Sequence, residues 1–224
     1  MRKVIYIVAV FITVNLFALP ASAILIVDTG TPPVSWGGLT LDVKNQGLAG
    51  RFNVSSSYNI TGIYGWMGFV NAGSLEAILY KGSVPGFYTS KLVPDTANEL
   101  YRQSFPLTSN GSLNDWYGIS GLNWQITPGD YWVAFQGAVT PSYFTGWMPI
   151  GAPHPLTNYA TYWPLTDKYS GWDQTFTLGF RVNADEVITT NGNGGVPIIP
   201  EPATMFLVGS GCAGFFLKKR KQII

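Results

Sequence analysis

The chain has 224 residues, of which 11% are charged and 15% are aromatic, and it contains 26 glycines and 15 prolines. Soluble proteins carry about 25% charged residues, so few charges combined with many aromatic rings and turn formers favour an all-β domain outside the cytoplasm. Seven basic and eleven acidic residues lie between positions 24 and 190, and this balance excludes nucleic acid as an expected partner, because phosphate binding requires clustered Lys and Arg.

Residues 1–23 predict a secretory signal peptide. Two basic residues follow Met1, residues 4–19 are almost entirely apolar, and Ala21 and Ala23 form a small-x-small cleavage site. We expect a signal helix that signal peptidase removes after Ala23. An uncleaved membrane anchor is the alternative.

Residues 24–190 predict one antiparallel β-sandwich, jelly-roll-like, because apolar stretches alternate with turn formers and no stretch keeps a helical period. The only cysteine, Cys212, lies outside this body, so no disulfide can form within it. The expected strands are residues 39–43, 50–54, 60–64, 74–80, 121–126, 130–135 and 175–182.

The clearest predicted hairpin joins residues 121–126 to residues 130–135. Thr127-Pro128-Gly129 lies between them and has Pro and Gly at the positions that a tight turn favours. In the second strand, Trp132 points away from its two neighbours, and we expect one of the two faces of this strand to be open.

Residues 144–172 predict a loop-rich surface with many aromatic rings. Exposed planar rings stack on the apolar faces of sugars, while neighbouring Asn, Asp and Gln side chains bond to the hydroxyl groups. The alternative is that these rings cover the sandwich core, since a domain without cysteine needs that burial. The candidate glycan-binding residues are Trp147, Tyr162, Trp163 and Trp172.

The body contains no convincing catalytic or metal-binding pattern. His154 is the only histidine, lies between two prolines and has no nucleophile-elbow motif with it, so we expect a loop histidine. Asn110, Asn114 and Asp115 are close in sequence but fit no standard calcium loop, which favours an ordinary turn. The acidic residues are spread along the body, so the sequence does not single out a pair of carboxylates for glycoside hydrolysis. We therefore expect no metal, no cofactor and no catalysis.

Residues 191–199 predict a linker, and residues 200–224 predict a short membrane segment with a processing signal before it. The uncharged segment 203–217 would form a helix of about 22 Å at about 1.5 Å per residue, short of a hydrocarbon core of about 30 Å. Pro200 and Pro202 interrupt any helix and leave Glu201 accessible to a protease. The positive-inside rule keeps the basic tail cytoplasmic and the body outside; the tail is Lys218, Lys219, Arg220 and Lys221.

The C-terminal segment combines Pro200-Glu201-Pro202-Ala203-Thr204, an apolar stretch with Gly-Ser-Gly, and a final Lys-Lys-Arg-Lys. This order closely resembles the PEP-CTERM sorting signal, and the resemblance covers about the last 25 residues. It implies an exported protein of a Gram-negative bacterium that exosortase, an integral-membrane enzyme, processes during delivery to the cell surface or extracellular matrix. A plain tail anchor is the alternative.

The body is also similar to the sandwich domains often found before such signals, through residues 120–135. We therefore expect an exported surface or matrix protein with a structural or adhesive role, associated with exopolysaccharide as in a biofilm. Its expected partners are signal peptidase, exosortase, the inner membrane through residues 203–217, and exopolysaccharide. The alternatives are a carbohydrate-binding module that uses the Trp-rich surface and a glycan hydrolase.

Overall fold

The computed structural model describes residues 23–33, 38–42, 46–108, 113–137, 145–172 and 177–187. The predicted signal helix, the linker 191–199 and the C-terminal segment 200–224 lie outside these residues, and so does Ala21 of the predicted cleavage site. The predicted bounds of the segments therefore stay predictions.

Every strand pair that the structure describes is antiparallel, which confirms the all-β sandwich. The described residues contain no α-helix and one short 3-10 helix, η1 (Thr96–Asn98). The strands are β1 (Ile24–Asp28), β2 (Gly38–Asp42), β3 (Gly47–Val54), β4 (Tyr58–Phe69), β5 (Gly73–Lys81), β6 (Ser83–Pro85), β7 (Leu92–Pro94), β8 (Glu99–Leu107), β9 (Asp115–Ile126), β10 (Gly129–Gly137), β11 (Thr145–Pro149), β12 (Asn158–Trp163), β13 (Lys168–Trp172) and β14 (Phe180–Glu186).

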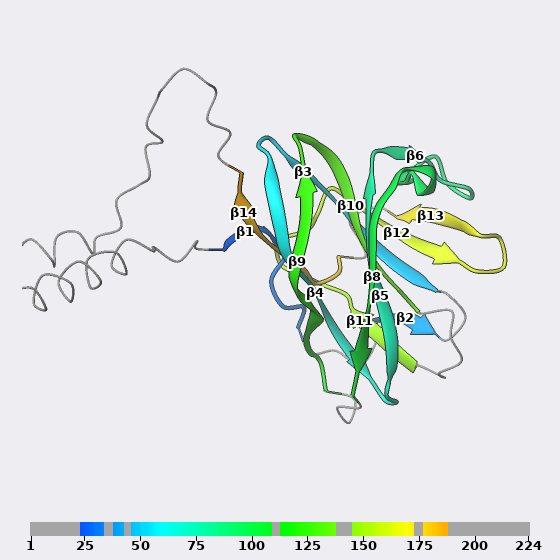
Figure 1. Cartoon of the computed structure of the whole chain (residues 1–224). Helices are drawn as coiled ribbons and strands as arrows, with labels where there is room; N and C mark the ends of the chain where they lie inside the picture. Colours follow the sequence, from blue (N-terminus) through cyan, green and yellow to red (C-terminus); the bar gives the residue numbers. More distant parts are fainter. Residues whose placement is uncertain are drawn as a thin grey trace, which may run out of the picture. The chain divides into compact units, whose positions relative to one another are not determined.

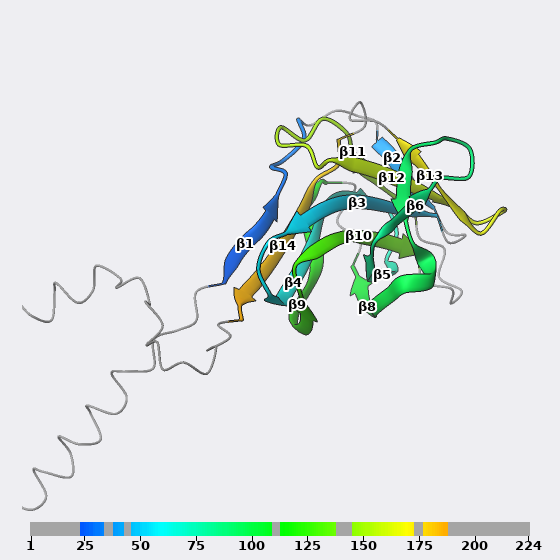
Figure 2. The ribbon, with the colours of Figure 1, turned by 90° about the horizontal axis from the view of Figure 1, so that it is seen from above.

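The strands form two layers, which curve around a common core (Figures 1 and 2). Layer 1 has the order β1-β14-β4-β11-β2, with β9 also paired to β4. Layer 2 has the order β13-β12-β3-β10-β5-β8, and β6 and β7 form a separate two-stranded hairpin. At one edge the layers meet, because the Tyr101 ring of β8 stacks on Trp124 of β9 with centroids 5.1 Å apart.

The main core lies between the layers and is rich in aromatic rings. Tyr131, Val133 and Phe135 of β10 point into it from layer 2, and Ile63 and Phe180 point into it from layer 1. The rings of Phe135 and Phe180 stack with centroids 5.9 Å apart. These residues alternate along their strands with residues of the other face, as the period of two requires.

Six predicted strands are found, within β2, β3, β4, β5, β9 and β10, with Val43 outside the described residues. Of the predicted closing strand 175–182, residues 175 and 176 lie outside the described residues, Leu178 makes an isolated bridge to Ile150, and β14 begins at Phe180.

The predicted hairpin of residues 121–126 and 130–135 is wrong. β9 pairs with β4 in layer 1, whereas β10 pairs with β3 and β5 in layer 2. The turn therefore carries the chain from one layer to the other. The Tyr131 hydroxyl holds this crossing, because it donates to the Thr127 carbonyl at 2.7 Å and accepts from the Thr127 amide at 3.2 Å. β10 is buried on both faces, which a central strand requires.

The predicted open face of β10 is also covered. Trp132 and Ala134 have no exposed surface and join Tyr80, Val93 and Tyr169 in a second hydrophobic cluster on the outer side of layer 2. The β6–β7 hairpin contributes Val93 to this cluster, and the Trp132 indole donates to the Ser83 hydroxyl at 2.9 Å. The prediction failed because this hairpin folds back over the strand.

Candidate functional site

The four predicted glycan-binding rings do not form one surface. Trp147 lies on β11 in layer 1, opposite Thr40 of β2 and Gly68 of β4. The other three lie in layer 2, on the hairpin of β12 and β13. Residues 145–172 therefore contain three strands, and the expectation of a loop-rich surface is wrong.

The β12–β13 hairpin divides its three rings between two faces. Tyr162 is opposite Tyr169, whereas Trp163 is opposite Lys168, one position along, so Tyr162 and Trp163 point to opposite faces. The Tyr162 ring packs against Tyr169 with centroids 5.1 Å apart, and its hydroxyl donates to Asp167. Burial, together with this carboxylate, raises the pKa of Tyr162 to about 12. Tyr162 thus extends the second cluster, as the core-covering alternative proposed.

Trp172 and Trp163 differ in how far their side chains are exposed. The Trp172 indole donates to the Thr161 hydroxyl at 2.8 Å and is half-buried. Trp163 is 40% exposed. Its backbone carbonyl accepts a hydrogen bond from the Thr166 amide in the tight turn of the hairpin. Of the four predicted residues, Trp163 is the one in the exposed class, and the other three are half-buried.

Sequence reasoning missed two aromatic residues beside this hairpin. Phe87 is 51% exposed and Tyr88 is 64% exposed, in the turn between β6 and β7. The Phe87 amide donates to the Tyr169 carbonyl at 3.2 Å, and the Lys168 ammonium lies 4.3 Å from the centroid of the Phe87 ring. Two bulky rings directly after Gly86, in a stretch rich in turn formers, were the available signal.

These contacts bring the two turns together at one end of the body. The Thr89 hydroxyl also donates to the Gly171 carbonyl at 3.0 Å, so the β6–β7 turn satisfies acceptors on the free edge of β13. Leu165, in the β12–β13 turn, is 97% exposed. We name Phe87, Tyr88, Trp163 and Leu165 the aromatic tip.

The outer face of layer 1 holds a second aromatic group, around β4. Trp66 and Trp116 make an edge contact with centroids 5.5 Å apart. The Arg181 guanidinium lies 3.9 Å from the centroid of Trp116 and pairs with Asp28 at 3.2 Å. Trp147 occupies the space above Gly68, where a Cβ atom would come within 2.7 Å of its ring. These rings are half-buried, and they contact other residues on the same outer face of layer 1.

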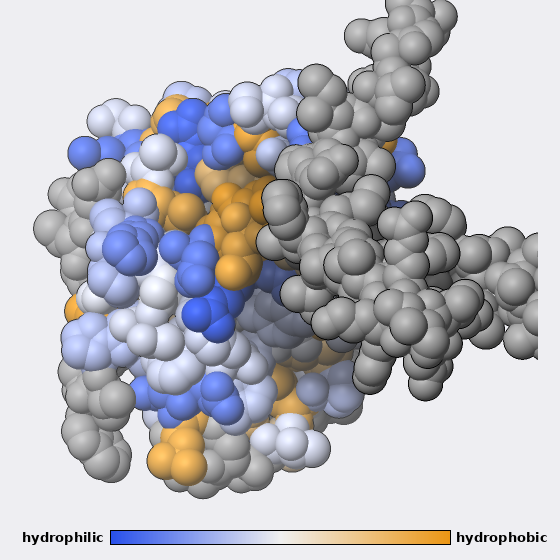
Figure 3. All heavy atoms as spheres, turned by 90° about the vertical axis from the view of Figure 1, so that its left-hand side faces the viewer, coloured by the Kyte–Doolittle hydropathy of each residue, from blue (hydrophilic) through white to orange (hydrophobic). Residues whose placement is uncertain are grey.

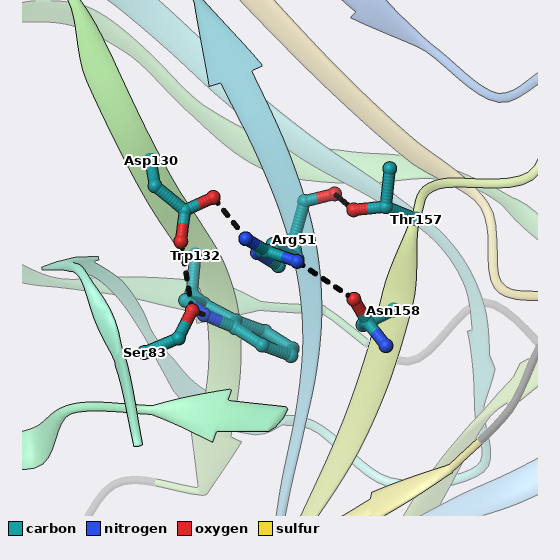
Figure 4. Close-up of polar contacts among 6 residues, drawn as sticks. All are labelled: Arg51, Ser83, Asp130, Trp132, Thr157 and Asn158. Atoms are coloured by element: carbon teal, nitrogen blue, oxygen red, sulfur yellow. Dashed lines mark hydrogen bonds and ion pairs between the residues drawn. The ribbon is translucent and has the colours of Figure 1, made fainter. Parts of the chain in front are cut away.

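A polar network lies over Trp132 on layer 2 (Figure 4). Arg51 pairs with one oxygen of Asp130 at 2.8 Å and donates to Asn158 at 3.0 Å. The other Asp130 oxygen accepts from Ser83 at 2.7 Å. Both oxygens of this carboxylate are thus occupied, and the network ties β3, β10 and β12 to the β6–β7 hairpin.

Glu76 and Glu99 also form ion pairs. Arg102 binds both Glu76 and Glu99, and the hydrogen bond to Glu99 raises the pKa of Arg102, against the effect of burial. His154 is exposed and donates its backbone amide to Thr29. Within the part of the chain that the structure describes, no three His, Cys, Asp or Glu residues are grouped to hold a metal ion.

Of the residues for which an ordinary turn was predicted rather than a calcium loop, Asn110 lies outside the described residues, and Asp115 accepts from the Trp116 amide at 2.7 Å. Among the described residues, no helix has the length and apolar character needed to cross a membrane.

The remaining predicted site residues, Pro200, Glu201 and Pro202 with the basic tail, lie outside the described residues, so the comparison with known families bears on them. No curated protein sequence matches the chain significantly. A family model described as the PEP-CTERM protein-sorting motif matches residues 199–221. The chain therefore carries this motif at its C-terminal end, as predicted from Pro200 to Lys221, and the motif indicates an exported cell-surface protein that exosortase sorts.

Proposed function

We propose that residues 24–190 form a structural or adhesive domain without catalytic activity, which associates with exopolysaccharide outside the cell. The sorting motif indicates export to the cell surface. In the β-sandwich, the carboxylates of four acidic residues form ion pairs: Asp28, Glu76, Glu99 and Asp130. Glycoside hydrolysis needs two carboxyl groups that flank one bond in a cleft, whereas each of these four carboxylates is paired with an arginine.

The aromatic tip is the observation that carries this proposal. Among the described residues, the three exposed aromatic side chains, Phe87, Tyr88 and Trp163, all belong to it. Planar rings at the surface suit stacking on sugar rings, and buried aromatic residues elsewhere already fill the core. The carbohydrate-binding role is thus the specific form of adhesion that the surface favours.

The position of the tip also suits a tethered adhesin. β1 and β14 pair at Ile24 and Ala184, so the two ends of the described body lie together. In Figures 1 and 2 these ends lie at the left, and the turns of the β6–β7 and β12–β13 hairpins lie at the right. The end at which the chain continues towards the sorting motif is therefore opposite the end that carries the exposed rings.

Affinity electrophoresis of the purified chain in gels that contain the producer's polysaccharide tests the proposal. We expect retardation of the wild-type chain and weaker retardation of Trp163→Ala, with Leu100→Ala as the control, because Leu100 is also 40% exposed but lies on β8. Equal mobility of the wild-type chain with and without polysaccharide contradicts association. Release of new reducing ends on incubation contradicts the absence of catalysis.

A further inference from the structure

We propose that the aromatic tip, together with Lys91 and Lys168, forms a binding surface for acidic polysaccharide, with chains rich in uronic acids as the ligand class. This inference rests on the proposed function and makes it specific, because it names the site and the charge of the glycan. The β6–β7 and β12–β13 turns form this surface together, although they are about 80 positions apart in the sequence.

Hydrogen bonds to β13 hold the turn that carries Phe87 and Tyr88, although both rings are exposed. The Phe87 amide and the Thr89 hydroxyl bond to two carbonyls of β13, those of Tyr169 and Gly171. The Phe87 and Tyr88 rings make an edge contact with centroids 4.6 Å apart. A preorganised aromatic surface loses little conformational entropy when it binds, which favours recognition of a repetitive chain.

The charges at the tip favour an anionic ligand. All three described arginines are in ion pairs, whereas the described lysines, Lys81, Lys91 and Lys168, make none among the described residues. Two of these three lysines lie at the tip, on a body in which acids outnumber bases. Asp167 lies in the β12–β13 turn and accepts from Tyr162, but it keeps its negative charge. The two lysines outnumber this one acid at the two turns, so the tip has a small excess of positive charge that complements a uronate carboxylate.

The Lys168 ammonium lies directly over the Phe87 ring. A cation held against a ring is partly stabilised by the ring's electrons and keeps its remaining donors for a ligand. A uronate residue that stacks on the exposed aromatic surface places its carboxylate within reach of such a lysine. The same surface thus contacts the apolar face of the sugar and pairs with its carboxylate.

The other exposed large hydrophobic residues of the described body are aliphatic, among them Ile24 and Leu25 of β1. Figure 3 views the molecule from the side opposite the tip, and the coloured part of this face has hydrophobic patches among hydrophilic residues. An aliphatic surface lacks the planar rings that stack on sugars, so the aromatic tip is the part of the described body that suits a glycan.

The test compares the full chain, purified in mild detergent, in gels containing alginate, a polyuronate, or dextran, a neutral glucan. We expect strong retardation in alginate that falls as salt rises, and weak retardation in dextran. Tyr88→Ala with Trp163→Ala should weaken alginate binding about tenfold, the scale of a central contact residue. Lys91→Gln with Lys168→Gln should weaken it and reduce its salt dependence.

Lys81→Gln and Leu100→Ala are the matched controls and should bind like wild type, since Lys81 lies beside Thr127, away from the two turns. Thermal unfolding of each variant establishes that it is folded. Full alginate binding by both folded double variants overturns the inference. If these variants also keep binding the producer's polysaccharide, the proposed association stands and only its site is wrong; if wild type binds no polysaccharide, both fail.

Equal retardation of wild type in dextran and alginate overturns the assignment of an acidic ligand. Vesicles that contain phosphatidylglycerol provide the last comparison. If the tip variants lose vesicle binding but keep alginate binding, the tip contacts a lipid surface and the inference is wrong.

Discussion

Trp132 on β10 and Trp163 on β12 have different environments in layer 2, where β3 lies between their strands. Trp132 is fully buried under the β6–β7 hairpin and donates to Ser83, whereas Trp163 is 40% exposed at the aromatic tip. The same residue type therefore stabilises the fold at one position and is available for binding at the other.

The change Trp132→Ala should lower the free energy of unfolding by about 3–5 kcal/mol, because it removes a large buried side chain and leaves a cavity. Trp163→Ala should lower it by less, about 1–2 kcal/mol, because Trp163 is 40% exposed and buries a smaller area. Urea unfolding followed by circular dichroism measures both. Similar losses for the two variants would mean that Trp163 is part of the fold and not free to bind.

The buried tyrosines predict a loss of stability in alkali. Burial raises the pKa of Tyr80, Tyr159, Tyr162 and Tyr169 above 10.0 in the folded chain. Between the unfolded and the folded pKa values, the unfolded chain releases these protons and the folded chain keeps them. Stability is therefore unaffected by these groups below pH 10 and falls as pH rises above it, towards about 12 for Tyr162.

Tyr169→Phe isolates one of these groups. The Tyr169 hydroxyl is buried near the Tyr80 hydroxyl but makes no hydrogen bond of ordinary geometry among the described residues, so its removal should cost little stability at neutral pH. Above pH 10 the variant should lose stability less steeply than wild type. Chemical unfolding across this pH range, with tyrosinate absorbance recorded in parallel, gives both slopes. Parallel slopes for the two proteins would contradict a raised pKa at Tyr169.

At the scale of elements, β9 depends on a close approach to β4. Gly118 lies opposite Tyr64, and a Cβ atom at this position would come within 1.9 Å of the Ile63 carbonyl oxygen. Gly118→Ala should therefore push the strands apart and destabilise the protein by about 1–3 kcal/mol or more. The exposed neighbour on the same strand gives the control, Ser120→Ala, which should unfold like wild type in urea. Equal stability of the two variants would contradict the register of this pair.

The strands that sequence could predict are those with a clear apolar alternation. Residues 39–43 and 50–54 have this period and lie in β2 and β3, with Val43 outside the described residues. Strand partners follow from the packing of the two layers instead, which is why the turn at Pro128 suggested a hairpin and in fact crosses the core. The short β6 and β7 contain prolines at Pro85 and Pro94, which weaken a strand signal in sequence.

The candidate site was predicted in part for the same reason. Trp163 was named from its place in an aromatic-rich segment, and its exposure agrees with that role. Phe87 and Tyr88 join it only through the bonds between the β6–β7 turn and β13. Contacts between segments far apart in sequence leave no local pattern, so the joint surface became visible only in the folded chain.

At the scale of the whole molecule, the sorting motif and the aromatic tip make different demands on the same chain. Residues 199–221 match the motif that directs the protein to the cell surface, whereas the binding that we propose for the tip would follow delivery. The two functions should therefore separate in mutants. A chain with an altered motif should fold and bind polysaccharide normally but fail to reach the surface.

The replacement of Pro200, Glu201 and Pro202 by alanine tests this separation in the native host. These residues stand directly before the uncharged segment 203–217, so their loss should block processing while the basic tail still holds the chain at the inner membrane. Mass spectrometry should find the tail residues 218–224 absent from the wild-type surface protein and present in the variant, which fractionates with membranes. Trp163→Ala is the converse control and should be processed and delivered like wild type. A mature wild-type protein that keeps Lys218 to Ile224 would contradict removal of the tail, and delivery of the alanine variant to the surface would show that these three residues are not needed for sorting.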